Sequence, residues 1–200
     1  KPVIVSTGMA TLVELEALVA AIRKTGNEQF VLLKCTSSYP STAKHAHLKT
    51  ILHLRERFKC HIGLSDHTMG TAVALAATAL GAVLIEKHFT ISRADGGVDS
   101  SFSMEPAEMH ELVHNAKITF QALGGVQFGP TEGEKTSAKY KRSIYVIADV
   151  KKGEQLTREN IRVIRPGLGL SPLHLSSVLG KKSACDLYRG MALSWEHLGQ

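Results

Sequence analysis

Two histidines follow consecutive apolar stretches of the sequence and could together hold a metal ion. His67 follows "HIGLSD", and His88 follows "VLIEK" 21 residues later. If both stretches are neighbouring parallel strands, the two imidazoles lie roughly 5 Å apart, the spacing of a strand pair. Two nitrogen ligands leave several coordination positions open, which suits a divalent metal that also binds substrate. The alternative is that each histidine is a partly buried structural residue.

Two carboxylates lie next to these histidines in the sequence. Glu86 precedes His88 by two residues, so the alternation of a strand places both side chains on one face. Glu86 is therefore a candidate general acid or base, or a support for a metal ligand. Asp66 directly precedes His67, and we expect it to close a turn or to orient a neighbour.

The elements that must position these groups alternate between strand and helix over the first 124 residues. Strands are expected at 2–6, 29–35, 60–65 and 82–89, and helices at 11–26, 46–59, 70–81 and 105–124. Four β–α units predict a parallel sheet, either doubly wound or part of a (β/α)8 barrel. No glycine-rich or Walker motif follows a strand, so nothing supports a nucleotide-binding sheet.

Every predicted strand ends in polar residues. Hydroxyl, carboxylate and imidazole side chains follow the four apolar stretches, and Ser6, Ser37 and Ser65 are among them. In a barrel all these ends lie on the face where barrel enzymes work. We therefore favour the barrel, and we expect the small serine hydroxyls to hold a phosphate or a carboxylate.

The sequence changes character after residue 124. Residues 125–138 are rich in glycine and polar residues and are typical of a linker. Residues 139–200 show short strands and turns, with two matching stretches, "VKKGEQLTRENI" and "LYRGMALSWEHL". We expect a small β-rich domain with an internal repeat, in which Arg165 lies on the loop "IRPGLGL".

The charge and composition limit the class of protein. Residues 135–200 hold 12 lysine and arginine residues against 5 acidic ones, whereas the first 134 are nearly neutral. This basic region favours an anionic ligand. Nucleic acid is disfavoured, because aromatic residues are few and not interleaved with basic ones. The most apolar run, 72–85, is shorter than the roughly 20 residues of a membrane span.

The cysteines and the first residue bear on the cell compartment and on the length of the chain. Three widely spaced cysteines without a CxxC pair argue against a disulfide framework and for a reducing compartment, so we expect the cytoplasm. The chain starts at Lys1 and runs directly into a predicted strand. We therefore expect the natural N-terminus to lie upstream.

Six motifs, taken in order, resemble the sialic acid synthase family. They are "STGM", "CTSSYP", "GLSDHT", "IEKHFT", "GGVDSSFSMEP" and "RPGLGL". Members of this family condense phosphoenolpyruvate with an N-acetylated amino sugar, and their C-terminal module is an antifreeze-like (SAF) domain. The "GGVDSSFSMEP" and "CTSSYP" motifs resemble the pseudaminic acid synthase branch, since neuraminate and legionaminate synthases usually show "GPD" where this chain has "GVD".

The resemblance implies an α/β fold: the C-terminal half of a (β/α)8 TIM barrel at 1–124, a linker at 125–138 and an SAF domain at 139–200. The missing first half should carry lysines that bind phosphoenolpyruvate, so the chain alone should be inactive. The family has a divalent metal, usually Mn²⁺, with Mg²⁺ or Co²⁺ as alternatives, and forms a domain-swapped homodimer. The implied site residues are His67 and His88 for the metal, Ser6, Ser37 and Ser65 for phosphoenolpyruvate, Tyr39, Glu86 and Asp99 near the sugar, and Arg165 reaching into the other subunit.

Three other functions remain open at this point. The chain could come from an N-acetylneuraminate or legionaminate synthase rather than a pseudaminic acid synthase. It could come from a different metal-dependent barrel such as an aldolase, although aldolases lack a module with "RPGLGL". It could also be a saccharide-binding protein without catalysis, which the presence of His67, His88 and Glu86 disfavours.

Overall fold

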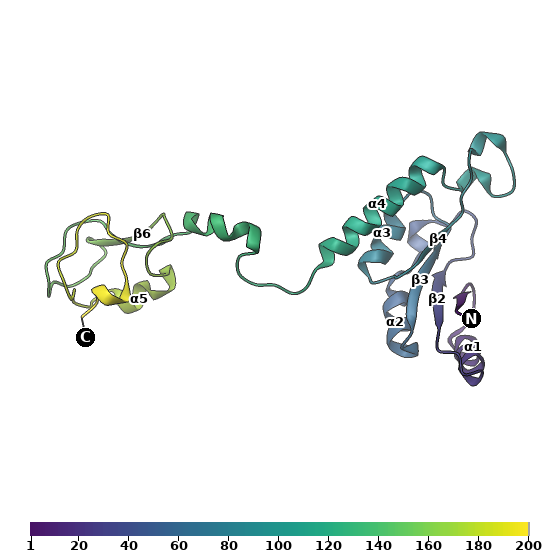
Figure 1. Ribbon diagram of the computed structural model, residues 1–200, viewed down its shortest axis with the longest axis horizontal. Coiled ribbons are helices and arrows are strands. Elements are labelled where there is room, and N and C mark those ends of the chain that lie inside the picture. Colours follow the sequence, from purple (N-terminus) through teal and green to yellow (C-terminus); the bar gives the residue numbers. More distant parts are fainter. Residues whose placement is uncertain (200) are drawn as a thin grey trace. The chain divides into compact units, whose positions relative to one another are not determined.

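The computed structural model describes residues 1–199 and divides the chain into two compact units, Lys1–Gly125 and Val126–Gln200 (Figure 1). Each unit has its own buried hydrophobic core. Within the described residues, no helix has both the length and the apolar character needed to cross a membrane.

The first unit consists of alternating strands and helices. Its main elements in chain order are β1 (Val3–Ser6), α1 (Leu12–Lys24), β2 (Phe30–Cys35), α2 (Lys49–Phe58), β3 (His61–Asp66), α3 (Ala72–Ala79), β4 (Ile85–Lys87) and α4 (Pro106–Leu123). Short 3₁₀ helices lie in the connections at Ala43–His45, Arg93–Asp95 and Ser100–Phe102. The eight predicted elements are all present, and β4 is shorter than the predicted strand at 82–89.

The sheet is parallel, and its strand order equals the chain order. The order is β1-β2-β3-β4 (Figure 1). Right-handed crossovers between neighbouring parallel strands place every helix on the same face. A doubly wound sheet would instead reverse its strand order at a switch point. The unit is therefore half of a (β/α)8 barrel, which confirms the predicted fold class.

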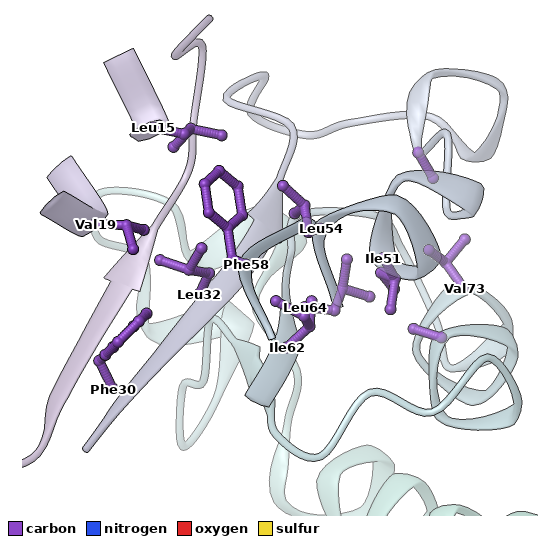
Figure 2. Close-up of a cluster of buried hydrophobic side chains, with 12 residues drawn as sticks. Leu15, Val19, Phe30, Leu32, Ile51, Leu54, Phe58, Ile62, Leu64 and Val73 are labelled. Atoms are coloured by element: carbon purple, nitrogen blue, oxygen red, sulfur yellow. The ribbon is translucent and has the colours of Figure 1, made fainter. Parts of the chain in front are cut away.

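The larger core of this unit joins α1, α2 and α3 to one face of the sheet, and a smaller cluster packs α4 against α3. Leu15 and Val19 of α1 and Phe58 of α2 pack against Leu32 of β2 and Ile62 of β3 (Figure 2). Because Leu32 and Ile62 are paired in the register of the sheet, their side chains point to the same, helix-covered face. The opposite face corresponds to the interior of a barrel.

Local signals explain where the helices begin and end. Thr11 caps α1 through a capping box with Glu14, as a Thr-x-x-Glu sequence predicts. Helix α4 starts at Pro106 and ends before Gly124, which has a φ of +49°. These signals fix where α1 begins and where α4 begins and ends.

The second unit is built around a short antiparallel sheet. It contains a 3₁₀ helix (Glu132–Tyr140), β5 (Ser143–Val146), β6 (Ile161–Ile164) and α5 (Leu175–Val178), with two further 3₁₀ turns at Pro172–His174 and Trp195–His197. The long 3₁₀ helix occupies part of the predicted linker, where Thr131 and Glu134 form a capping box.

The internal repeat of the second unit forms two equivalent turns. Gly153 and Gly190 occupy matching positions and have φ values of +85° and +94°, which favour glycine. Leu156 and Leu193 follow three residues later in each copy, and both are fully buried. Each copy therefore contributes one turn and one core leucine to the same small domain.

Candidate active site

Polar residues gather at the carboxyl end of the four-stranded sheet. The register pairs Cys35 with Ser65 and Ser65 with Glu86 in one row, and Asp66 with Lys87 in the next. Paired residues share a face, and successive rows alternate between faces. Core leucine and isoleucine residues lie two positions before Asp66 and Lys87 on the same strands. The Asp66–Lys87 row therefore faces the helices, and the row with Ser65 and Glu86 faces the barrel interior.

Glu86 is held in place by a neighbouring hydroxyl. Ser65 Oγ donates a hydrogen bond to Glu86 Oε1 at 2.6 Å. Ser65 is buried and Glu86 is exposed. The predicted contact of Ser65 with an anionic substrate would require its hydroxyl to turn away from Glu86, because a hydroxyl has one proton to donate. In this structure Ser65 orients the carboxylate that was predicted to move protons.

The ring of His67 is fixed by a main-chain carbonyl. His67 Nδ1 lies 2.9 Å from the carbonyl oxygen of Thr36, and the residue is buried. Because a carbonyl only accepts hydrogen bonds, Nδ1 carries a proton, and in the neutral imidazole Nε2 then carries the lone pair. This is the arrangement usual for a metal-binding histidine, whose other nitrogen donates to a carbonyl or a carboxylate.

His88 lies beside His67, as predicted. The ring centroids are 5.2 Å apart and the planes meet at 77°. His88 Nδ1 lies 3.7 Å from Asp99 Oδ2, and both side chains are about one third exposed (31% and 38%). The structure thus brings three of the predicted residues together, two imidazoles and a carboxylate that accompanies one of them.

Two aromatic side chains surround the histidine pair. The ring of Tyr39 is 4.2 Å from that of His67 and 5.8 Å from that of His88, and its place near the sugar stays a prediction. Phe102 is 5.1 Å from the His88 ring and is buried. Sequence reasoning missed Phe102, because it comes from an irregular loop between β4 and α4 that has no periodic signal.

The loop that carries Asp99 is anchored by an arginine. Arg93 Nη1 donates to the Ser103 carbonyl at 3.0 Å and to Glu108 Oε2 at 2.5 Å, and its backbone N–H donates to Glu105 Oε1 at 2.8 Å. These bonds connect the loop to the first turn of α4. The hydrogen bond from Arg93 is the main cause that lowers the pKa of Glu108, and the Glu105 backbone N–H adds to it.

The remaining predicted residues lie at separate positions. Ser6 ends β1 and Ser37 follows β2, and both are exposed. Gly8, which follows β1, lies close to the loop after β2, since a Cβ on Gly8 would lie 3.3 Å from Ser37 Oγ. Arg165 follows β6 in the second unit and is exposed.

His67 and His88 are the two candidate metal ligands at this site. Among residues 1–199, no group of three or more histidine, cysteine and acidic side chains is placed to hold a metal ion. His67 has the tautomer that a ligand needs, and His88 is its immediate neighbour. A cation here would take two protein nitrogens and complete its coordination from water or substrate.

A buried ion pair behind the site was also missed. Lys87 Nζ lies 2.9 Å from Asp66 Oδ2, and both side chains are 2% exposed. The signal was present in the sequence: each residue continues the helix-facing alternation of its strand, and the two carry opposite charges. Charged residues at core-facing positions are almost never buried without a partner.

A second buried amine lies on the same face of the sheet. Lys34 of β2 donates from Nζ to Thr36 Oγ1 at 2.5 Å, and the residue is 7% exposed. Burial lowers the pKa of Lys34, although the nearby Cys35 and Asp66 act in the opposite direction. Thr36 therefore contacts both residues: its hydroxyl accepts from Lys34, and its main-chain carbonyl accepts from His67.

Comparison with known proteins agrees with the geometry. The NeuB family model matches residues 1–128, and the SAF domain model matches residues 141–199. The pseudaminic acid synthase of Campylobacter jejuni subsp. jejuni serotype O:2 is 39% identical over 193 residues, which are 96% of this chain and 56% of that protein. The N,N'-diacetyllegionaminic acid synthase of Legionella pneumophila is 36% identical over 98% of this chain and 57% of that protein.

A solved structure gives the same result. The N-acetylneuraminic acid (sialic acid) synthetase of Leptospira borgpetersenii serovar Hardjo-bovis is 37% identical, with a TM-score of 0.63 over 70% of this chain and 48% of that one. The chain spans about half the length of these relatives. The resemblance of the six motifs is thereby confirmed: the chain belongs to the NeuB family and carries an SAF domain at residues 141–199.

Proposed function

We propose that the intact protein condenses phosphoenolpyruvate with an N-acetylated amino sugar to a nonulosonic acid, with pseudaminic acid as the product, and releases phosphate. The observation that carries this proposal is the pair of imidazoles at the strand ends, 5.2 Å apart, with Nε2 of His67 left free by the Thr36 carbonyl. The names of the relatives, which include pseudaminic and legionaminic acid synthases, support the class of product.

The histidine pair fits a divalent cation, and Mn²⁺ is the ion we propose, with Mg²⁺ and Co²⁺ as alternatives. His67 Nε2 and a nitrogen of His88 would hold it. A cation bound there would act as a Lewis acid toward a carbonyl oxygen of the acceptor sugar. His88 is partly exposed and the neighbouring Tyr39 is exposed, so a substrate could reach the pair from solvent.

The proposed reaction makes one carbon–carbon bond and replaces the phosphate oxygen on C2 by the oxygen of water. C3 of phosphoenolpyruvate bonds to the aldehyde carbon of the open-chain sugar, and the aldehyde oxygen takes up a proton to become a hydroxyl. Water adds to C2 and loses a proton, the bond from C2 to the phosphate oxygen breaks, and the remaining C2 hydroxyl gives its proton to the departing phosphate to leave a ketone. Glu86 is the group that we assign to proton transfer, because Ser65 holds one of its oxygens at 2.6 Å while the carboxylate remains exposed. It accepts the proton of the incoming water.

The other residues would bind and orient the substrates. Ser6 and Ser37 carry exposed hydroxyls on adjacent strand ends, which suits an anion such as phosphoenolpyruvate. Tyr39 and Asp99 lie beside the imidazole pair, where the sugar would react. We further propose that the intact protein is a homodimer in which Arg165 of one subunit closes the anionic site of the other.

Phosphate release by the intact protein with phosphoenolpyruvate and Mn²⁺ tests the proposal. The two acceptors to compare are 2,4-diacetamido-2,4,6-trideoxy-altrose and N-acetylmannosamine. We expect release with the first sugar only. Release with the second only would replace pseudaminic acid by N-acetylneuraminic acid as the product. No release with these two sugars or with the legionaminic acid precursor would contradict the proposed condensation.

A further inference from the structure

We propose that the buried ion pair between Asp66 and Lys87 is a positioning device that fixes the separation of His67 and His88. The inference deepens the proposed function and rests on it, because it concerns how the two imidazoles are held for a cation. Neither Asp66 nor Lys87 faces the barrel interior. Both act through the histidines that follow them in the chain.

Each member of the Asp66–Lys87 ion pair is next in the chain to one of the two histidines. Asp66 directly precedes His67, Lys87 directly precedes His88, and the register of β3 and β4 places Asp66 opposite Lys87. Because successive side chains of a strand point to opposite faces, an ion pair on the helix-facing side leaves the imidazoles on the other side. A contact of 2.9 Å between Nζ and Oδ2 therefore ties the two strand ends together in addition to the backbone pairing of β3 and β4.

The same two side chains also hold the residue after His67. Asp66 Oδ1 accepts from the backbone N–H of Thr68 at 2.9 Å and from its hydroxyl at 2.8 Å. Lys87 Nζ donates to the Thr68 carbonyl at 2.7 Å. His67 is thus flanked on both sides by residues tied to β4. The carbonyl of His67 accepts from the backbone N–H of Ser41 at 2.8 Å, and this bond holds His67 to the loop that follows β2.

The buried ion pair between Asp66 and Lys87 contributes more to the geometry of the strand ends than to the free energy of unfolding. Both side chains are 2% exposed, and a buried ion pair often contributes little net stability compared with apolar residues of the same size. Apolar replacements would fill the space but would leave the polar groups of Thr68 without partners. What the charged pair adds is directional bonding at several atoms, and a metal site needs its ligands held within about 0.5 Å.

The test measures binding of Mn²⁺ alone to the intact protein. Free Mn²⁺ is followed by electron paramagnetic resonance for wild type, Asp66→Asn, Lys87→Met and the double variant, in which no uncompensated charge is left buried. We expect each variant to bind Mn²⁺ at least about tenfold more weakly, the usual effect of removing a support of a metal ligand. Affinities within twofold of wild type in all three variants would overturn the proposal.

A matched control separates positioning from general loss of stability. Leu54 is buried in the core between α2 and the sheet and is not among the partners of the ion pair. We expect Leu54→Ala to lower the unfolding midpoint as much as Lys87→Met or more, and to leave the Mn²⁺ affinity unchanged. An equal loss of Mn²⁺ affinity in Leu54→Ala would mean that Asp66 and Lys87 act only through stability, which overturns the proposal.

A second readout does not need a bound metal. The ring ¹⁵N and ¹³C signals of His67 report its tautomer, and a nuclear Overhauser contact between His67 and His88 reports their approach. We expect Lys87→Met and the double variant to change both signals and Leu54→Ala to change neither. If wild type binds no Mn²⁺, the metal part of the proposed function fails. The ring signals then decide the positioning role, and unchanged signals in the variants overturn it.

Discussion

A substitution at Glu86 can test proton transfer without removing the hydrogen bond that Glu86 accepts from Ser65. Glu86→Gln keeps an oxygen that can accept from Ser65 Oγ, but it removes the carboxylate that takes a proton. We expect kcat to fall about 10²- to 10⁴-fold, the usual contribution of a general base, with KM changed little. Steady-state phosphate release measures both constants, and Mn²⁺ affinity should stay at the wild-type value. A wild-type kcat in Glu86→Gln would remove Glu86 from the proposed reaction.

At His67 the expected effect is on the metal. His67→Ala removes the free Nε2 and should abolish Mn²⁺ binding at micromolar protein and metal. Isothermal titration of the intact protein with Mn²⁺ measures this. His61→Ala is the matched control, because His61 is an exposed histidine at the opposite end of the same strand. Unchanged Mn²⁺ affinity in His67→Ala would contradict the proposed ligand.

At the scale of elements, Gly63 sets how closely β4 approaches β3. A Cβ at this position would lie 2.5 Å from the Leu84 carbonyl oxygen and 2.5 Å from Leu33 Cδ2. We therefore expect Gly63→Ala to push the strands apart and to cost about 1–3 kcal/mol of the free energy of unfolding. Chemical denaturation measures it. Gly125→Ala, where a Cβ meets nothing within 4 Å, should be close to neutral, and an equal cost in both variants would contradict the explanation.

The loop between β4 and α4 should respond to pH through Glu108. Its pKa is lowered from 4.5 by Arg93 and by the Glu105 backbone. A carboxyl with a lowered folded-state pKa contributes stability above its unfolded value and loses that contribution as the pH falls through its folded value. Glu108→Gln should therefore be less stable than wild type at pH 7, by about 1 kcal/mol or less because solvent screens the pair.

Denaturation curves at several pH values check this prediction. The difference between wild type and Glu108→Gln should be constant above about pH 5 and shrink as the Glu108 carboxylate protonates at lower pH. Glu111→Gln, on the exposed surface of the same helix, serves as the control. A difference that grows toward low pH would show that the sign of the Glu108 shift is wrong.

Sequence patterns predicted the elements better than the contacts between them. Apolar alternation and helical spacing located the four strands and four α-helices of the first unit, and the histidines at consecutive strand ends predicted that His67 and His88 lie together. The contacts of Phe102 and the Arg93 anchor depend on an irregular loop, whose path no periodicity encodes. The Asp66–Lys87 pair was readable in principle, because its two charges occupy core-facing strand positions.

At the scale of the whole molecule, the proposed dimer makes a prediction about mixtures of inactive proteins. Arg165→Ala and His67→Ala should each be inactive as homodimers. If Arg165 acts on the other subunit, a mixed dimer has one site with both residues intact. Random exchange of subunits at equal amounts should then restore about a quarter of wild-type phosphate release. No recovery after verified exchange would contradict the swapped arrangement.

The hydrogen bond that selects the tautomer of His67 runs from its Nδ1–H to the main-chain carbonyl of Thr36. Any L-amino acid at position 36 has the same carbonyl, but the Thr36 hydroxyl helps to hold that carbonyl in place, because it accepts from Lys34 Nζ and donates to the His45 carbonyl. The choice of ring nitrogen is therefore encoded in the path of the backbone rather than in the identity of a partner residue. Insertions, deletions or a reshaped turn after β2 should therefore disturb the tautomer of His67, and a substitution at position 36 should do so only where loss of the Thr36 hydroxyl bonds shifts this backbone.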